Sequence, residues 1–343
     1  MTNLHLKILP SIHAIEPVIW DQLSEMRPFQ SHQWYAFGEQ VMKDCLPIYL
    51  LVYEENCLIA RACLWLIRNE PLPPNLPKPL RKLVSAFLNA WPLLICRSPM
   101  ANASGLIVPN DTRRETALSM LTQAALLEGR QRGASFVMFD FLKEFDVQSW
   151  PSGFVTTKLP NAGTVMENRW RTMDEYLAHG NKKDRQHYKR SLREAEKRGI
   201  GLTQHSRVSD MEAALRLIRE VERRYSSPPN PWMRSLLENI EIVKGIWLEA
   251  HIGKRLVGCG LILEDNETQM TTALGLTGNE TYVYFLLVYA SLEAAFEKRV
   301  RLLRWGTGAY EVKHRLGFEL EHDNFLKLSG TNRLTNLISQ LAA

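Results

Sequence analysis

The run Arg304-Trp-Gly-Thr-Gly-Ala-Tyr-Glu-Val-Lys-His-Arg-Leu-Gly-Phe318 decides how this chain is interpreted. It follows a short apolar strand expected at Val300 to Leu303 and precedes a final strand expected at Leu320 to Leu328. Gly306 and Gly308 let the backbone turn tightly or come close to a ligand. A strand that ends in glycines followed by polar side chains is where open α/β sheets place their sites. The alternative is a glycine turn that leads into a solvated basic helix.

The residues after these glycines supply hydrogen-bond donors and one titratable imidazole. Tyr310, Lys313 and His314 are the candidate catalytic residues, and Gly306 and Gly308 are candidates for binding a donor. Tyrosine can protonate a leaving group or anchor a substrate, and an imidazole can accept a proton near neutral pH. Tyr310 is the leading candidate in this stretch.

The stretch resembles the C-terminal signature of the Fem/CelD-like branch of the GNAT acyltransferases. The matching residues are Gly306, Gly308, Tyr310, Lys313, Arg315, Gly317 and Phe318. In that branch tyrosine and lysine are adjacent, whereas Glu311-Val312 separates them here, so the role of Lys313 transfers less directly than that of Tyr310. The resemblance extends over roughly residues 165 to 328. It implies transfer of an acyl group from a thioester to an amine.

Length and composition are those of a globular protein. The chain has 343 residues, enough for two domains of ordinary size, with 45% apolar and 23% charged residues. We find no N-terminal signal pattern and no apolar run of roughly 18 residues that could span a bilayer. The five cysteines form no C-x-x-C pair and have no histidine at metal spacing. We therefore expect a cytoplasmic protein without a transmembrane segment, metal or disulfides.

A hairpin–helix–strand order occurs twice along the chain. In the first half it comprises a hairpin over 48–53 and 58–67, a helix over 112–132 and a strand over 135–141. In the second half it comprises a hairpin over 246–251 and 256–263, a strand over 269–274, a helix over 282–298 and a strand over 300–303. Without a gap, Ile48 aligns with Ile246, and Ala62 with Gly260. With the GNAT resemblance, this repeat predicts an α/β protein of two tandem GNAT-like domains, residues 1–160 and 161–343. Each would be a mixed, mostly antiparallel sheet flanked by helices.

Residues 182 to 198 form a basic helix with eight cations and three carboxylates, a net charge of +5 that equals that of the whole chain. One interpretation is a solvated helix face. The other is a surface that docks an acyl carrier protein, a coenzyme phosphate or RNA. Family members carry a basic helix at this place, which Lys183, Arg185, Lys189 and Arg190 resemble. Fem ligases that use aminoacyl-tRNA carry an extra helical hairpin that we do not find, which argues against tRNA without excluding it.

Aminolysis of a thioester needs a neutral amine and a stabilised oxyanion. Because a lysine-type amine has a pKa of about 10.4, a base must remove its proton. Glu222 is the candidate base, with an ion pair to Arg223 or Arg224 as the alternative. Tyr225 and Trp232 are candidates for lining the same cavity.

The usual GNAT loop for the coenzyme diphosphate, Q/R-x-x-G-x-G/A, is absent. Ahead of the helix that starts near Tyr282 stands Gly275-Leu-Thr-Gly-Asn-Glu280, which keeps part of that glycine content. We therefore keep Tyr282 as a donor-binding candidate, with acyl carrier protein and acyl-CoA both open as donors.

The sequence thus predicts an N-acyltransferase that moves an acyl group from acyl-CoA or acyl carrier protein to an amine on a peptide or an amino sugar. Two alternatives remain: a Fem-like transferase that takes its aminoacyl group from charged tRNA, and a non-catalytic binding module. The apolar segment Leu80 to Cys96 either covers an acyl chain or is ordinary core or interface helix.

Overall fold

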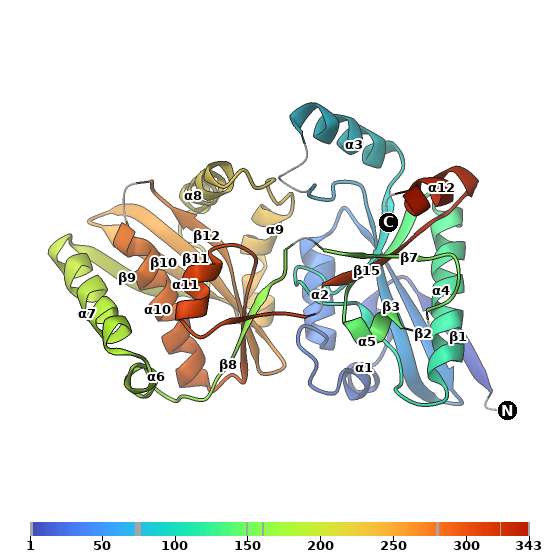
Figure 1. The fold of residues 1–343 in the computed structure, drawn as a ribbon, viewed down its shortest axis with the longest axis horizontal. Coiled ribbons are helices and arrows are strands. Elements are labelled where there is room, and N and C mark those ends of the chain that lie inside the picture. Colours follow the sequence, from blue (N-terminus) through green and yellow to red (C-terminus); the bar gives the residue numbers. More distant parts are fainter. Residues whose placement is uncertain are drawn as a thin grey trace. The chain divides into compact units, whose positions relative to one another are not determined.

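The computed structural model describes residues 3–72, 77–148, 150–159, 161–278, 281–322 and 324–341. The chain divides into two compact units, which we describe separately (Figure 1). Unit 1 comprises Met1–Ala162 and Glu321–Ala343, and unit 2 comprises Gly163–Leu320. The division expected from the sequence, 1–160 and 161–343, differs from this because the C-terminal segment joins the sheet of unit 1.

Unit 1 contains a sheet of eight strands in the order β1-β2-β3-β4-β6-β15-β7, with β5 paired to β3. Its strands are β1 Leu4–Leu9, β2 Leu46–Glu54, β3 Cys57–Ile67, β4 Leu93–Cys96, β5 Leu106–Ile107, β6 Phe136–Leu142, β7 Val155–Lys158 and β15 Phe325–Gly330. Its α-helices are α1 Pro17–Ser24, α2 His32–Val41, α3 Lys78–Ala90, α4 Arg114–Gln131, α5 Glu144–Val147 and α12 Arg333–Leu341.

Unit 2 contains a sheet of seven strands in the order β14-β8-β13-β12-β11-β10-β9. Its strands are β8 Thr164–Glu167, β9 Ile200–His205, β10 Ile246–Ile252, β11 Arg255–Asp265, β12 Thr268–Leu276, β13 Leu302–Trp305 and β14 Glu319–Leu320. Its α-helices are α6 Met173–His179, α7 Lys182–Lys197, α8 Met211–Arg224, α9 Met233–Glu238, α10 Thr281–Lys298 and α11 Tyr310–Arg315.

Apolar periodicity explains the core of each unit. In unit 1, Ala117, Leu118, Leu121 and Ala125 recur at helical spacing on α4 and pack in one buried cluster with β2 and β3. In unit 2, α10 is apolar on most sides because it contacts both the sheet and α7. Each described sheet has one parallel strand pair, β4–β6 or β12–β13, and antiparallel pairs elsewhere. The expected mixed, mostly antiparallel α/β architecture is confirmed.

The strands that flank the boundary are exchanged between the sheets. β15 lies antiparallel between β6 and β7 in unit 1, and β8 lies antiparallel between β13 and β14 in unit 2. The single final strand expected at 320–328 is therefore wrong, because its two ends form β14 and β15 in different sheets. The exchange gives β6 and β13 a hydrogen-bonded neighbour on the side away from their parallel partner.

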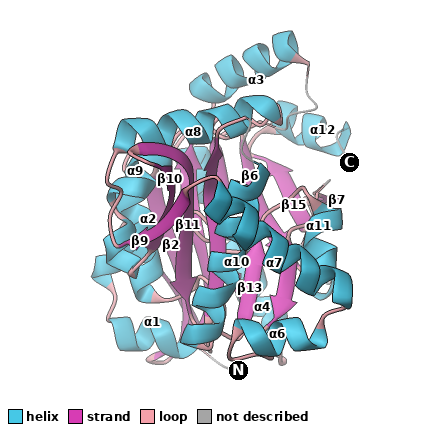
Figure 2. Cartoon of the chain, turned by 90° about the vertical axis from the view of Figure 1, so that its left-hand side faces the viewer, coloured by secondary structure: helices cyan, strands magenta, loops and turns pink. Residues whose placement is uncertain are grey.

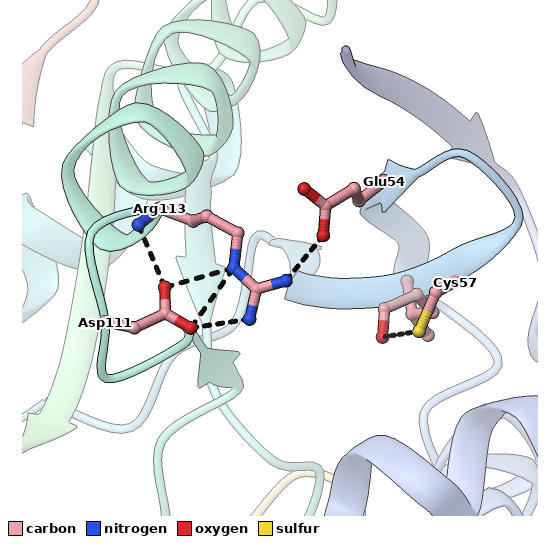
Figure 3. A network of polar contacts seen from close by, with 5 residues as sticks. Glu54, Cys57, Asp111 and Arg113 are labelled. Carbon is pink, nitrogen blue, oxygen red and sulfur yellow. Dashed lines mark hydrogen bonds and ion pairs between the residues drawn. The ribbon is translucent and has the colours of Figure 1, made fainter. Parts of the chain in front are cut away.

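Polar contacts tie the loops of unit 1 to its sheet. Arg113, just ahead of α4, pairs with Glu54 at the end of β2 at 2.6 Å and with Asp111 at 2.5 Å (Figure 3). Hydrogen bonds from Arg113 lower the pKa of Asp111 to about 2. At the end of β4, Arg97 contacts Glu70 at 2.8 Å and the buried Asp140 of β6 at 2.5 Å. These pairs fix the chain where it leaves the strands.

A truncation tests the strand exchange. Removing residues 321–343 takes β15 away, so we expect the amides of β6 in unit 1 to lose most of their protection from hydrogen exchange. The amides of β11 in unit 2 should keep theirs. Removing only residues 333–343 takes away α12 but leaves β15, and serves as the control. Unchanged protection of β6 in the longer truncation would contradict the exchange.

Asp140 provides a pH test of unit 1. Burial raises its pKa from 3.8 to about 6, although Arg97 acts in the opposite direction. A carboxyl whose pKa is raised by folding stabilises most when protonated, and that contribution is lost as the pH rises through about 6. Between about pH 4 and pH 7 the free energy of unfolding of the wild type should therefore fall by roughly 2 kcal/mol relative to Asp140→Asn. If chemical denaturation gave the wild type and Asp140→Asn the same change in the free energy of unfolding with pH, this prediction would be refuted.

Candidate functional site

The parallel strands β12 and β13 separate within the sheet of unit 2. They pair over four positions, from Thr268↔Leu302 to Thr271↔Trp305, where β13 ends. β12 continues to Leu276 and pairs there with β11. In the described part of unit 2, one side of residues 272–276 thus faces no strand. Backbone donors and acceptors on such an edge are available to a ligand.

A bulge lies on this part of β12. The register with β11 shifts between Cys259 and Leu261, and Ala273 on β12 has a left-handed backbone with φ of 51°. That conformation is uncommon for a residue with a side chain and occurs often at functional sites. Gly260 occupies the shifted position on β11, and a Cβ added to it would meet nothing within 4 Å. The bulge therefore redirects the backbone of β12 next to open space.

The loop after β13 is closed by a buried lysine. Gly308 has φ of 83° and Ala309 has φ of 49°, which turn the chain into α11. Lys313 is 7% exposed, and its ammonium donates a hydrogen bond to the carbonyl oxygen of Gly306. The same ammonium lies 6.0 Å from the ring centroid of Tyr310. Lys313 therefore holds the glycine loop against the first turn of α11, a role that its charge alone did not reveal.

Tyr310 and His314 lie one helical turn apart on α11. Tyr310 is its first residue and is half-buried, whereas His314 is exposed. Residues four apart on a helix lie on the same face, so both side chains start from one side of α11. Gly306 and Gly308 are exposed, with no atom within 4 Å of an added Cβ. The structure thus brings these four candidates together beside the end of β13.

Stacked aromatic rings form the base of this loop. The Trp305 ring at the end of β13 stacks on Phe318 with 4.2 Å between centroids. Phe318 is buried, and its N–H donates to the carbonyl oxygen of Lys313 at 3.0 Å. The glycine of the Gly317-Phe318 pair has φ of 92°, which a residue with a side chain rarely adopts. Both ends of the signature are therefore anchored in the core.

Two arginines lie at the N-terminal end of α10. The guanidinium carbon of Arg198 lies 5.1 Å from the ring centroid of Tyr282, and a guanidinium nitrogen of Arg224 lies 3.3 Å from the point where a Cβ of Gly278 would stand. Burial, with a smaller effect of Tyr225, raises the pKa of Tyr284 on α10. Asn279 and Glu280 of the expected donor loop lie outside the described residues. A helix N-terminus with nearby arginines suits a phosphate.

Glu222 is engaged on both carboxylate oxygens. One oxygen pairs with Arg219 at 2.6 Å and the other accepts from the Asn230 N–H at 3.2 Å. The expected pairing with Arg223 or Arg224 is wrong, because Glu222 pairs instead with Arg219, one turn earlier on α8. The Asn230 side chain accepts in turn from the N–H of the buried Trp232 at 2.9 Å. Glu222 and Trp232 thus stabilise the connection from α8 to α9, while Tyr225 in that connection is 67% exposed.

The basic helix α7 divides into structural and exposed cations. The guanidinium of Arg185 donates to the carbonyl oxygens of Leu177 and Gly180, and so satisfies the C-terminal end of α6. Lys183, Lys189 and Arg190 are exposed. The exposed cations are those that remain available for docking.

Sequence reasoning missed a histidine–tyrosine pair between α7 and α10. His187 Nδ1 lies 2.8 Å from the Tyr289 hydroxyl. Burial, followed by the charges of Arg190 and Arg315, lowers the pKa of His187, and burial raises the pKa of Tyr289 to about 12. Both groups are therefore neutral at pH 7 and link α7 to α10. Their separation of 102 residues leaves no local sequence signal.

In the described ranges, no three His, Cys, Asp or Glu side chains are grouped so that they could hold a metal ion. All five cysteines are free thiols. None of the helices in the described part of the chain is long and apolar enough to cross a membrane.

Comparison with solved structures identifies the architecture. A structure of FemX superposes with a TM-score of 0.63 and 12% identity, covering 97% of this chain and 100% of that one. A tandem GNAT protein from the clavulanic acid biosynthesis pathway, solved without acetyl-CoA, gives 0.58 and 14%, covering 96% and 99%. No protein-family model and no curated protein matches the sequence. The chain has the tandem GNAT fold, as expected.

Lys313→Met tests the loop closure. Losing the ammonium leaves the Gly306 carbonyl without this donor, so we expect the free energy of unfolding to fall by about 1.5–3 kcal/mol and the amides of 306–309 to exchange faster. Arg315→Met, an exposed cation on the same helix, is the matched control and should change little. Equal effects of the two substitutions in thermal unfolding and hydrogen exchange would contradict the proposed closure.

Proposed function

We propose that this chain is an N-acyltransferase that moves an acyl group from a thioester donor to an amine. The observation that carries the proposal is the free edge of β12 at 272–276, with its bulge at Ala273, beside the loop that presents Tyr310. An extended pantetheine arm carries amide groups that can pair with such an edge as a strand would. The similar tandem GNAT protein, solved without acetyl-CoA, supports a donor of this class.

The bulge supplies the first element of the chemistry. Attack of the amine on the thioester carbonyl places negative charge on its oxygen. Backbone N–H groups of 272–276 that no strand engages can stabilise that oxyanion, because they are fixed before the reaction begins. No side chain is needed for this step.

Proton transfer falls to α11. We assign Tyr310 as the acid that protonates the leaving thiolate, and His314 as the acceptor of the amine proton, since a ring nitrogen of imidazole can accept a proton. Lys313 positions Tyr310 by holding the glycine loop. Glu222 has a structural role in this scheme, because both of its carboxylate oxygens are engaged.

The N-terminal end of α10 is the proposed place for the donor's phosphate groups. Arg198, Arg224 and the helix N-terminus together provide positive charge and hydrogen-bond donors next to Tyr282. Acyl-CoA and a phosphopantetheine arm on acyl carrier protein both have a phosphate at the corresponding point. The exposed cations of α7 would then contact the rest of the coenzyme or the acidic surface of the carrier. We place the reaction in the cytoplasm, where the free thiols remain reduced.

The basic helix α7 is also compatible with the alternative function, transfer of an aminoacyl group from charged tRNA. Exposed Lys183, Lys189 and Arg190 could contact phosphates. In that case binding of tRNA should weaken steeply with salt, and aminoacyl-tRNA rather than acyl-CoA should support turnover.

The test is intact-mass analysis of products from acyl-CoA and acyl-carrier donors of several chain lengths with peptide and amino-sugar acceptors. Wild type should acylate at least one amine, and Tyr310→Phe should lower kcat by about 100-fold or more, since general acid catalysis contributes about that much. His314→Gln should also lower kcat, because it removes the group that accepts the amine proton. Glu311→Gln, on the exposed side of the same helix, is the control.

Two outcomes would contradict the proposal. Donor binding without product from any acceptor would indicate a non-catalytic module. Turnover that Tyr310→Phe leaves unchanged would remove α11 from the chemistry.

A further inference from the structure

Helix α3 of unit 1 is amphipathic and exposes part of its apolar side. Leu80, Leu83, Val84, Phe87 and Trp91 recur every three or four residues and form one stripe. Leu88, at one margin of the stripe, is buried and attaches the helix to the unit. At the other margin Leu83 is 67% exposed, and Leu80 and Trp91 are exposed as well. The described part of unit 1 therefore leaves an apolar face of α3 uncovered.

Helix α12 has its apolar side outward. Thr335 and Ser339 face the unit and are buried, and the hydroxyl of Ser339 donates to the carbonyl oxygen of Asn336 at 2.7 Å. Its large apolar side chains occupy positions i, i+3, i+4 and i+7 and are all exposed: Leu334, Leu337, Ile338 and Leu341. A helix on the surface of a water-soluble protein normally buries its apolar side and exposes its polar side. The reversed arrangement of α12 indicates that its outer face contacts an apolar environment.

The two helices account for much of the apolar surface of the molecule. Of sixteen exposed large hydrophobic side chains in the described residues, seven belong to α3, its C-terminal residue Trp91, and α12. Both helices lie at the same end of unit 1 in two views at right angles (Figures 1 and 2). Scattered apolar residues are ordinary on protein surfaces, but apolar stripes of this kind mark a binding surface.

The charged residues of these two helices are all basic. Lys78, Arg81, Lys82 and Arg333 are the charged residues within α3 and α12, and neither helix contains aspartate or glutamate. Leucine and tryptophan on one side with lysine and arginine on the other is the composition of helices that lie in a membrane interface. A second copy of the chain would bring like charges together, which disfavours self-association through this face.

We propose that α3 and α12 form a surface that binds an anionic lipid bilayer. The exposed leucines and Trp91 would enter the boundary between headgroups and acyl chains, and the exposed Lys82 and Arg333 would contact lipid phosphates. This binding is peripheral and does not depend on the proposed acyl transfer. It also assigns the segment Leu80 to Cys96: its first part is this surface helix, and its last part is the buried strand β4.

Vesicle co-sedimentation of the full chain tests the proposal. Binding should be weak to phosphatidylcholine vesicles, stronger when phosphatidylglycerol is included, and reduced by salt. Leu83→Asp and Leu337→Asp should each weaken binding by roughly 10-fold or more, because each removes a leucine from the interface. Lys82→Gln and Arg333→Gln should each weaken it by about fivefold on anionic vesicles.

The substituted leucines are exposed, so the variants should fold, which circular dichroism and thermal unfolding check. Val18→Asp, at an apolar residue of α1 that is 69% exposed, is the matched control and should bind like the wild type. Absence of wild-type binding to anionic vesicles would overturn the proposal. So would a dimer in light scattering that Leu83→Asp dissociates while vesicle binding is absent, since the face would then belong to a second copy.

Discussion

The short parallel pairing of β12 and β13 is the constraint on which the site in unit 2 depends. The strands pair at four positions, and then β13 ends at Trp305 while β12 continues. The end of β13 requires a tight turn, which Gly308 and Ala309 provide with left-handed backbones. That turn needs a buried donor, which Lys313 supplies to Gly306. The free edge of β12, the glycine loop and the position of Tyr310 thus all follow from the early end of β13.

Unit 1 has an equally short parallel pair but fills the space beyond it. β4 and β6 also pair at four positions, from Leu93↔Phe136 to Cys96↔Phe139. Three contacts hold the chain after β4. Arg97 binds the carboxylate of Asp140, and the Ser98 hydroxyl donates to the carbonyl oxygen of Phe29. The indole N–H of Trp34 donates to the carbonyl oxygen of Pro99. These contacts attach the segment that follows β4 to neighbouring elements of unit 1. The same architecture therefore gives a closed core in one unit and an open strand edge in the other.

Regular elements could be predicted from the sequence because they follow local periodicity. Leu118 and Leu121 mark the inner face of α4, and Ser31, a residue type typical of helix starts, caps α2 by accepting from the Trp34 N–H. The exchange of β8 and β15 could not be predicted, since both are short and their partners are distant in sequence. The roles of Lys313 and Glu222 were equally hidden: a lysine bound to a carbonyl, or a glutamate bound to Arg219 rather than Arg223, has no pattern in the chain. The signature in the sequence thus identified the candidate residues, but their contacts depend on the backbone conformation, which the sequence pattern does not give.

The most direct measurement is a crystal structure with an acyl-CoA analogue in which a methylene group replaces the thioester sulfur and the carbonyl is kept. The account predicts that the analogue's arm lies along residues 272–276 as an added strand. Its carbonyl oxygen should accept a hydrogen bond from a backbone N–H of the bulge near Ala273, and its phosphates should lie at the N-terminal end of α10. An analogue bound away from this edge, with residues 272–276 still unpaired, would contradict the central claim.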